Sequence, residues 1–378
     1  MGTWLGKGLA TVLLAATSYA GVRLMFQSET SLSAMIPMLT MAKKTGLMPD
    51  GEPVRTYYTG VEVLDDILTG LVVFFTLLMD GHDDASHRFS LWFLPQIAPL
   101  MVHMYWETTK RRSPFARIPT LFGLAMQLYT GGIMLPIYYA LSALTSSAVP
   151  KQPRGDAEGK ARALLPAVIL AFFVPSVALF LSPQSVPLDT KQIVAAVWQF
   201  FPLWMAILYN VFRVLLHTER SAPPGSDAVS DAQTRAALKW VKRAYLFCGL
   251  VCAAAHIYVL YTTLVTDASP GALLKVFVPY TLYHYLPVPP PASDVANYRR
   301  ATRQLFQFDW FCMTVASLVF FGWSHVATAR QGKKDMGLGG WLARVAVLSV
   351  LGGPGAAISW AAFAREERIF ALQRVKKE

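Results

Sequence analysis

Charged residues are scarce in this chain. Asp, Glu, Lys and Arg make up 15% of its 378 residues, whereas a typical soluble domain holds about 25%. Hydrophobic residues reach 54%, and the mean hydropathy is +0.39. A lipid-facing surface excludes charge, so this composition disfavours a water-soluble enzyme and favours a membrane protein.

Cysteine is also scarce, and recognisable cofactor motifs are lacking. Cys248, Cys252 and Cys312 all lie in apolar segments, so no disulfide framework is indicated. Cys248, Cys252 and His256 share one helix face, for which we favour ordinary packing over a metal site. The sequence has no dinucleotide-binding glycine motif, Walker loop, His-Glu-x-x-His or Gly-x-Ser-x-Gly. We therefore expect no metal and no cofactor.

The net charge of +11 is distributed in short basic clusters. These clusters lie at 111–112, 299–300, 333–334 and 374–377. Basic residues beside membrane spans contact anionic lipid headgroups and influence orientation, so we expect membrane lipids as partners and no nucleic acid.

Long apolar segments account for most of the chain. A helix needs about 20 mostly apolar residues to cross a bilayer. The segments that fit are near 4–24, 59–79, 90–107, 117–145, 163–182, 192–216, 240–265, 305–328 and 339–363. The shorter segment 271–286 ends in prolines and fits a re-entrant or interfacial helix. These patterns predict an all-α, polytopic transmembrane helix bundle of about eight or nine spans, formed by one domain over 1–378.

The role of the first apolar segment and the orientation of the chain in the membrane are left open by the sequence. Lys7, an apolar run and Ser18-Tyr19-Ala20 resemble a secretory signal, although we favour a retained first helix. Lysine and arginine occur in loops on both sides of the predicted membrane, so they do not define one orientation.

Glu107 is the most conspicuous acid, because it closes an apolar span. His103 lies four residues before it and therefore on the same helix face. A carboxyl among aromatic rings in an apolar pocket tends to hold its proton, and a neutral carboxylic acid can protonate an olefin or epoxide. The competing interpretation is that Glu107 lies at headgroup level and pairs with Lys110 or Arg111.

Other charged residues near spans have similar double interpretations. Asp309 lies in the first turn of a span within an aromatic collar, where it is either a dipole-stabilised helix start or a catalytic acid. Arg213 either extends to the interface or pairs with an acid such as Glu107. Asp65 and Asp66 fit a negatively charged helix start, and the alternative is a catalytic role for whichever of the pair faces inward. The loop 80–84 lacks the spacing of a magnesium-diphosphate motif, so we favour a solvated loop.

Polar and aromatic side chains within the spans are candidates for substrate binding, because aromatic faces stabilise cations. Interface belts of Tyr and Trp explain part of the pattern equally well. The predicted substrate-binding residues are Trp106, Gln127, Tyr129, Tyr138, Trp204, Tyr209, Asn210, Arg213, His256, Tyr283 and Trp310.

One region has a family likeness. The segments Pro95–Glu107, Gly123–Tyr129 and Gly132–Tyr139 resemble fungal integral-membrane terpene cyclases of meroterpenoid biosynthesis, such as those of the ascofuranone and macrophorin pathways. The resemblance implies a metal-independent cyclase of the intramolecular lyase or isomerase type, in the endoplasmic reticulum membrane. Its apolar isoprenoid substrate would be a farnesylated phenol or quinone-like compound.

The resemblance also implies roles for individual residues. An acid would protonate the terminal epoxide or olefin, and the carbocation would cyclise before a base or water ends the reaction. Glu107 would be the proton donor, tuned by His103 or Arg213, and Asp309 the alternative donor or terminating base. The alternatives are a transporter or receptor for a hydrophobic small molecule and another membrane enzyme, such as a prenyl or acyl transferase.

Overall fold

The chain forms helices throughout the part that the structure describes. This computed structural model describes residues 2–26, 32–48, 51–110, 113–145, 156–181, 185–217, 231–267, 271–279, 281, 294–329 and 337–375. Across these ranges the only β-type pairing is an isolated bridge between Leu47 and Pro53. A helix satisfies its own backbone hydrogen bonds, as an apolar sequence in lipid requires. The predicted all-α class is confirmed.

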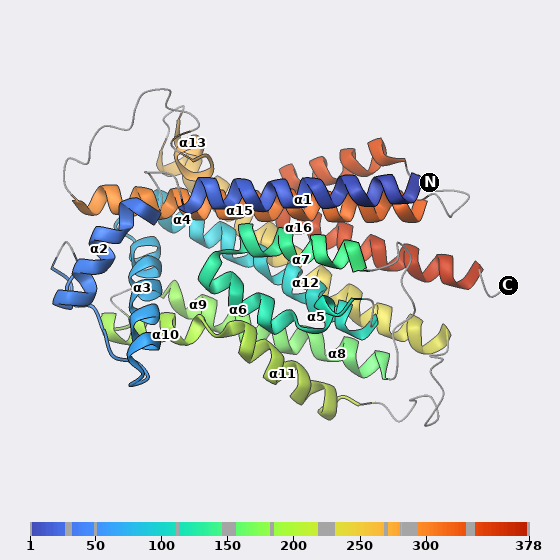
Figure 1. Ribbon diagram of the computed structural model, residues 1–378, viewed down its shortest axis with the longest axis horizontal. Coiled ribbons are helices and arrows are strands. Elements are labelled where there is room, and N and C mark those ends of the chain that lie inside the picture. Colours follow the sequence, from blue (N-terminus) through green and yellow to red (C-terminus); the bar gives the residue numbers. More distant parts are fainter. Residues whose placement is uncertain are drawn as a thin grey trace.

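Four long helices define the long axis of the molecule (Figure 1). They are α1 (Gly2–Phe26), α12 (Asp231–Thr266), α15 (Asp294–Ala329) and α16 (Leu338–Val375). Helix α12 packs along α16, and α1 packs against α15 and α7 (Gly131–Thr145). These contacts bury the apolar faces that the sequence patterns predict.

Shorter helices complete the bundle, and several continue one another across a break. Helices α4 (Asp84–Phe93) and α5 (Ile97–Glu107) are joined by the 3₁₀ turn η1 (Leu94–Gln96). Helices α8 (Ala157–Val168) and α9 (Val174–Leu179) are joined by a π-helical turn, η4 (Ile169–Phe173). Further short elements are η2 (Thr108–Lys110), η3 (Phe115–Arg117), α6 (Pro119–Tyr129), α10 (Leu188–Trp198), α11 (Phe201–Leu215) and α13 (Ala272–Phe277).

The number of spans is lower than the sequence suggests. Within the described ranges, five helices are long and apolar enough to cross a membrane. Those five are Leu5–Phe26, Ala157–Leu179, Ala232–Thr266, Tyr298–Ala329 and Leu338–Gln373. The pair α10 and α11, bent by 64°, would make a sixth. The expected eight or nine spans are therefore not confirmed, because prolines and tight turns divide the segments 90–107 and 117–145 into shorter helices.

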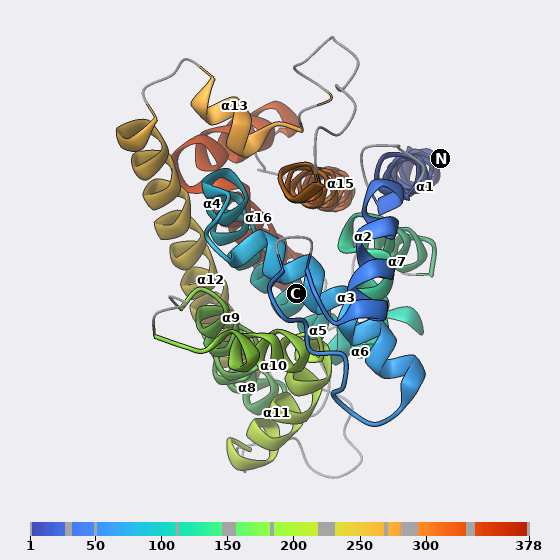
Figure 2. The ribbon, with the colours of Figure 1, turned by 90° about the vertical axis from the view of Figure 1, so that its left-hand side faces the viewer.

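Two N-terminal helices cover one end of the bundle. Helices α2 (Leu32–Thr45) and α3 (Glu62–Met79) pack on each other and on α15. Figure 1 shows α3 running across the direction of the long helices, and Figure 2 shows both helices at the end facing the viewer. The segment 59–79 is thus helical, as expected, but it lies across the bundle instead of along it. We refer to α2 and α3 as the cap.

The last long helix is kinked, and a predicted binding residue explains how the kink is accommodated. Gly353 has φ 80° and ψ 160°, and Pro354 follows it. A proline has no N–H for the carbonyl four residues earlier, which here is that of Val350. Nε2 of His256 lies 3.1 Å from this oxygen, and Nδ1 accepts a hydrogen bond of 2.8 Å from Trp92 Nε1. His256 therefore joins α12 to the kink in α16.

Candidate functional site

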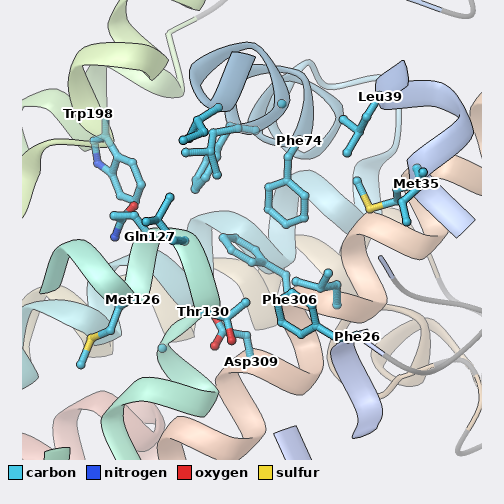
Figure 3. A pocket seen from close by; sticks show the side chains of 18 of the residues that line it. Phe26, Met35, Leu39, Phe74, Met126, Gln127, Thr130, Trp198, Phe306 and Asp309 are labelled. Atoms are coloured by element: carbon cyan, nitrogen blue, oxygen red, sulfur yellow. The ribbon is translucent and has the colours of Figure 1, made fainter. Parts of the chain in front are cut away.

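A large cavity lies between the cap and the bundle (Figure 3). Its volume is about 480 Å³, which lies within the roughly 300–1,000 Å³ range of small-molecule sites. Its walls come from the cap, the α6–α7 junction, the α10–α11 bend, and α1, α4, α5 and α15. The polar lining residues are Thr40, Lys43, Asp66, Gln127, Thr130 and Asp309.

Aromatic rings form much of the cavity wall. Phe306 on α15 lies at the centre of this group, with its ring centroid 4.8 Å from that of Phe93 and 5.4 Å from that of Phe74. Phe75 bridges Phe306 and Trp198, at centroid separations of 5.7 and 4.9 Å. The full aromatic lining is Phe26, Phe74, Phe75, Phe93, Trp198, Phe201 and Phe306. Such a wall presents ring faces that attract cations.

Asp309 is the buried acid of this cavity. Its residue is 6% exposed, and its side chain lies beside Thr130 (Figure 3). The backbone N–H of Gly132 donates to Oδ1, and the Thr130 hydroxyl and Gly131 N–H also lie in hydrogen-bonding contact with the carboxyl. No Lys or Arg pairs with Asp309 in the part of the chain described. The acid is therefore held by neutral donors at the start of α7.

The break between α6 and α7 creates this arrangement. Thr130 has φ 65° and ψ 153°, a backbone conformation that only glycine adopts readily, at a cost of roughly 1–3 kcal/mol. The turn exposes the first N–H groups of α7, which face the carboxyl. A Cβ at Gly132 would lie 2.9 Å from the backbone oxygen of Asp309, so glycine permits the close contact of α7 with α15.

Glu107 lies elsewhere, in a buried network of ion pairs. Its Oε1 accepts hydrogen bonds from Lys110 Nζ at 2.8 Å and from Arg365 Nη1 at 2.9 Å. Glu366 pairs with the same two cations, through Lys110 Nζ and, at 2.6 Å, Arg365 Nη1. All four side chains are at most 6% exposed. We call Glu107, Lys110, Arg365 and Glu366 the ion network.

His103 and Tyr138 accompany Glu107 but not the large cavity. Together they line a separate void of about 10 Å³, which is too small for an isoprenoid. Neither ring nitrogen of His103 has a hydrogen-bond partner among the described residues, and the ring packs edge-on to Phe320 and Phe321. His103 and Glu107 are thus neighbours, as predicted, in a closely packed region.

Three predicted tryptophans make hydrogen bonds to other residues of the protein. Trp106 Nε1 donates to Glu366 Oε2 at 2.8 Å, which adds it to the edge of the ion network. Trp310 Nε1 donates to Gln96 Oε1 at 3.1 Å, and Trp204 Nε1 to the Val197 oxygen at 3.0 Å. None of the three tryptophans lines the large cavity.

The remaining predicted binding residues divide by location. Gln127 lines the large cavity, whereas Tyr209 is buried against Tyr105. The other three described candidates, Tyr129, Asn210 and Arg213, are exposed. Tyr283 lies outside the described residues.

Acids at the start of the second predicted span and in the loop that follows it have structural partners. Asp65 accepts backbone hydrogen bonds from Tyr58, Thr59 and Gly60 at 3.2, 2.7 and 3.1 Å and so fixes the start of α3. In the 80–84 loop, Asp80 pairs with Arg299 and Asp83 with Arg303. Groups of three or more His, Cys, Asp or Glu that could hold a metal ion do not occur in the described ranges.

Sequence reasoning missed most of the cavity wall. The phenylalanines of α3 and α4, like Trp198, are unremarkable aromatic residues within apolar segments. A usable signal lies in the periodicity of α15, where Leu305, Phe306, Asp309 and Met313 recur on one helix face and all four line the cavity.

These features define an α-helical membrane-type protein with an aromatic cavity that holds one buried acid. The CtvD domain family matches residues 9–370, so the chain belongs to that family. The expected resemblance to fungal terpene cyclases is thereby confirmed.

Individual relatives are distant. The chain is 28% identical to terpene cyclase ctvD of Aspergillus terreus over 48% of this chain and 53% of the relative, so this match spans about half of ctvD. It is 25% identical to terpene cyclase DEP1 of Alternaria brassicicola over 89% of this chain and 93% of the relative. With terpene cyclase ascI of Acremonium egyptiacum the identity is 29%, over 47% and 48% of the two chains. No solved structure matches the chain.

Proposed function

We propose that this protein is a membrane terpene cyclase that protonates the terminal epoxide or olefin of a farnesylated phenol or quinone-like substrate. The observation that carries the proposal is the position of Asp309, a buried carboxyl on the wall of an apolar, aromatic cavity. The family membership and the terpene cyclase relatives support the same activity. The endoplasmic reticulum membrane, where apolar isoprenoids dissolve, is the proposed location.

In the proposed mechanism Asp309 acts as a neutral acid at the start of the reaction. Its O–H bond breaks as the proton goes to the epoxide oxygen or to the less substituted carbon of the terminal olefin, which leaves the positive charge on the dimethyl-bearing carbon. The Gly132 N–H, which already donates to Oδ1, stabilises the carboxylate that forms. The electrons of the neighbouring double bonds then attack the cationic carbon in turn and close the rings. Loss of a proton to a base, or capture by water, ends the sequence.

The aromatic wall is suited to the cationic stage. Ring faces attract a passing carbocation by about 0.5–2 kcal/mol each. Phe306 lies three residues before Asp309, on the same face of α15. Its ring contacts Phe74 and Phe93, so aromatic rings surround the region next to the acid. Exclusion of water by these rings would delay premature capture of the cation. The proposal needs no metal.

The test is an assay of microsomes containing the full-length protein with farnesylated and epoxyfarnesylated phenols, in the presence of a chelator. We expect cyclised products of unchanged composition, or with one added water, and their loss in Asp309→Asn. Activity should fall by about 10²–10⁴-fold, the range for removal of a general acid. The variant must be present at wild-type abundance for this comparison.

Two results would contradict the proposal. Full turnover by Asp309→Asn would remove Asp309 as the proton donor. Concentrative uptake of chemically unchanged substrate, without cyclised product, would favour a transporter for a hydrophobic small molecule.

A further inference from the structure

The rim of the large cavity is polar at the cap. Thr40 and Lys43 come from α2 and Asp66 from α3, and all three line the cavity. Lys43 Nζ lies 3.4 Å from Asp66 Oδ2, and the two side chains are 37% and 61% exposed. Two apolar rim residues, Ile36 and Ile67, are also exposed, at 53% and 37%. The rim thus combines an accessible ion pair with apolar side chains that suit lipid.

The spacing of these residues places them on the inner faces of both cap helices. Ile36, Thr40 and Lys43 follow one another at four and three residues on α2, which is one helix face. Asp66 and Gly70 are four residues apart on α3 and likewise share a face. An added Cβ at Gly70 would meet no heavy atom within 4 Å, so α3 leaves open space beside the ion pair.

The ion pair and Asp309 lie at different depths. The Thr302 hydroxyl contacts Met35 Sδ at 3.4 Å and marks the point where α2 crosses α15. Asp309 lies seven residues further along α15, which is about 10 Å at 1.5 Å per residue. Lys43 lies eight residues beyond Met35 on α2, which leads away towards the capped end of the molecule (Figure 1). The cavity therefore has a polar outer end and an acid further inside.

We propose that Lys43 and Asp66 form a subsite for the oxygen-bearing ring of the substrate, while the isoprenoid chain extends inward to Asp309. This inference rests on the proposed function, because that function supplies the amphipathic substrate. The Lys43 ammonium would donate to a phenol or carbonyl oxygen, and the Asp66 carboxylate would accept the phenol O–H. The subsite fixes the direction in which the chain enters and so brings its far end to the acid.

The test measures equilibrium binding in the full-length Asp309→Asn protein, which keeps the ligand unchanged. The probes are tritiated farnesylphenol and tritiated farnesylbenzene, which lacks only the hydroxyl group. We expect Lys43→Met and Asp66→Asn each to raise the Kd for farnesylphenol about tenfold, the effect of a lost hydrogen bond to a charged group. The Kd for farnesylbenzene should change less than about twofold, since burial of its chain is unaffected.

Lys275→Met is the matched control, because Lys275 forms a similar exposed ion pair with Asp267, at 3.3 Å, and does not line the cavity. Binding of both probes to this variant should match the Asp309→Asn parent. The subsite is overturned if Lys43→Met weakens binding of both probes equally or of neither, or if Lys275→Met weakens binding of farnesylphenol as strongly as Lys43→Met does. Because binding is read without turnover, failure of the subsite and failure of the cyclase activity are separate outcomes.

Discussion

Two of the buried acids of this protein, Asp309 and Glu107, occupy opposite kinds of environment. Asp309 faces a cavity of about 480 Å³ and is held by neutral donors of a helix start. Glu107 adjoins a void of about 10 Å³ and is held by Lys110 and Arg365. Burial of an acid is therefore not by itself a sign of chemistry. The two carboxyls differ in their partners and in the space next to them.

The ion network explains how an apolar bundle tolerates four charges. Two acids and two bases balance, and Trp106 Nε1 and Ser324 Oγ supply further hydrogen bonds. Such a group need not add stability relative to an apolar core. Removal of one partner is nevertheless costly, because it leaves a buried charge uncompensated. The network ties η2, α5 and α16 in one arrangement, whereas the Asp309 site leaves its acid accessible to a ligand.

The largest expected effect separates the two acids directly. Glu107→Gln should destabilise the fold by about 3–5 kcal/mol, because Lys110 and Arg365 keep only one acid between them. The molecules that do fold should retain turnover within a few fold, in contrast to the 10²–10⁴-fold loss expected for Asp309→Asn. Thermal unfolding in detergent and activity per folded molecule measure the two quantities. A stable but inactive Glu107→Gln protein would contradict this contrast, because it would indicate a catalytic role for Glu107.

Two phenylalanines provide a smaller test of the same contrast. Phe306→Leu in the cavity should lower the cyclisation rate about tenfold, because one cation-stabilising ring is lost. Phe320 stacks on Tyr139 with a centroid separation of 4.3 Å and lies near His103. Phe320→Leu should lower the free energy of unfolding, because the stacked contact is lost, and should leave the rate per folded molecule unchanged. Equal rate losses in both variants, measured as initial rates at saturating substrate, would contradict this division.

The smallest effect concerns the open space on α3. Gly70→Ala should raise the free energy of unfolding by about 0.5–1 kcal/mol, because glycine is a weak helix former. Turnover of the preferred substrate should fall less than about twofold, and Gly70→Leu should discriminate more strongly against substrates with bulky rings. Competition between small-ring and large-ring substrates measures the selectivity. Unchanged selectivity in Gly70→Leu would show that Gly70 faces away from the bound ring.

The sequence predicted some parts of the site and not others. Asp309 and Gln127 were recognisable as polar residues in apolar segments, and both line the cavity. The Glu107–Lys110 contact was also available, since the two are three residues apart on a helix. Arg365 and Glu366 were not, because they approach Glu107 from about 260 residues away along the chain. No local pattern specifies such a pairing.

The sequence by itself determined the apolar character of the chain, its helical class and the presence of acids within apolar segments. These follow from composition and from the need of a backbone in lipid to satisfy its own hydrogen bonds. Only the tertiary structure decided that α3 lies across the bundle, that the turn at Thr130 directs N–H groups at Asp309, and that Glu107 is enclosed by cations. The physical reason is that helix direction and long-range pairing depend on how faces pack together, which local spacing does not encode.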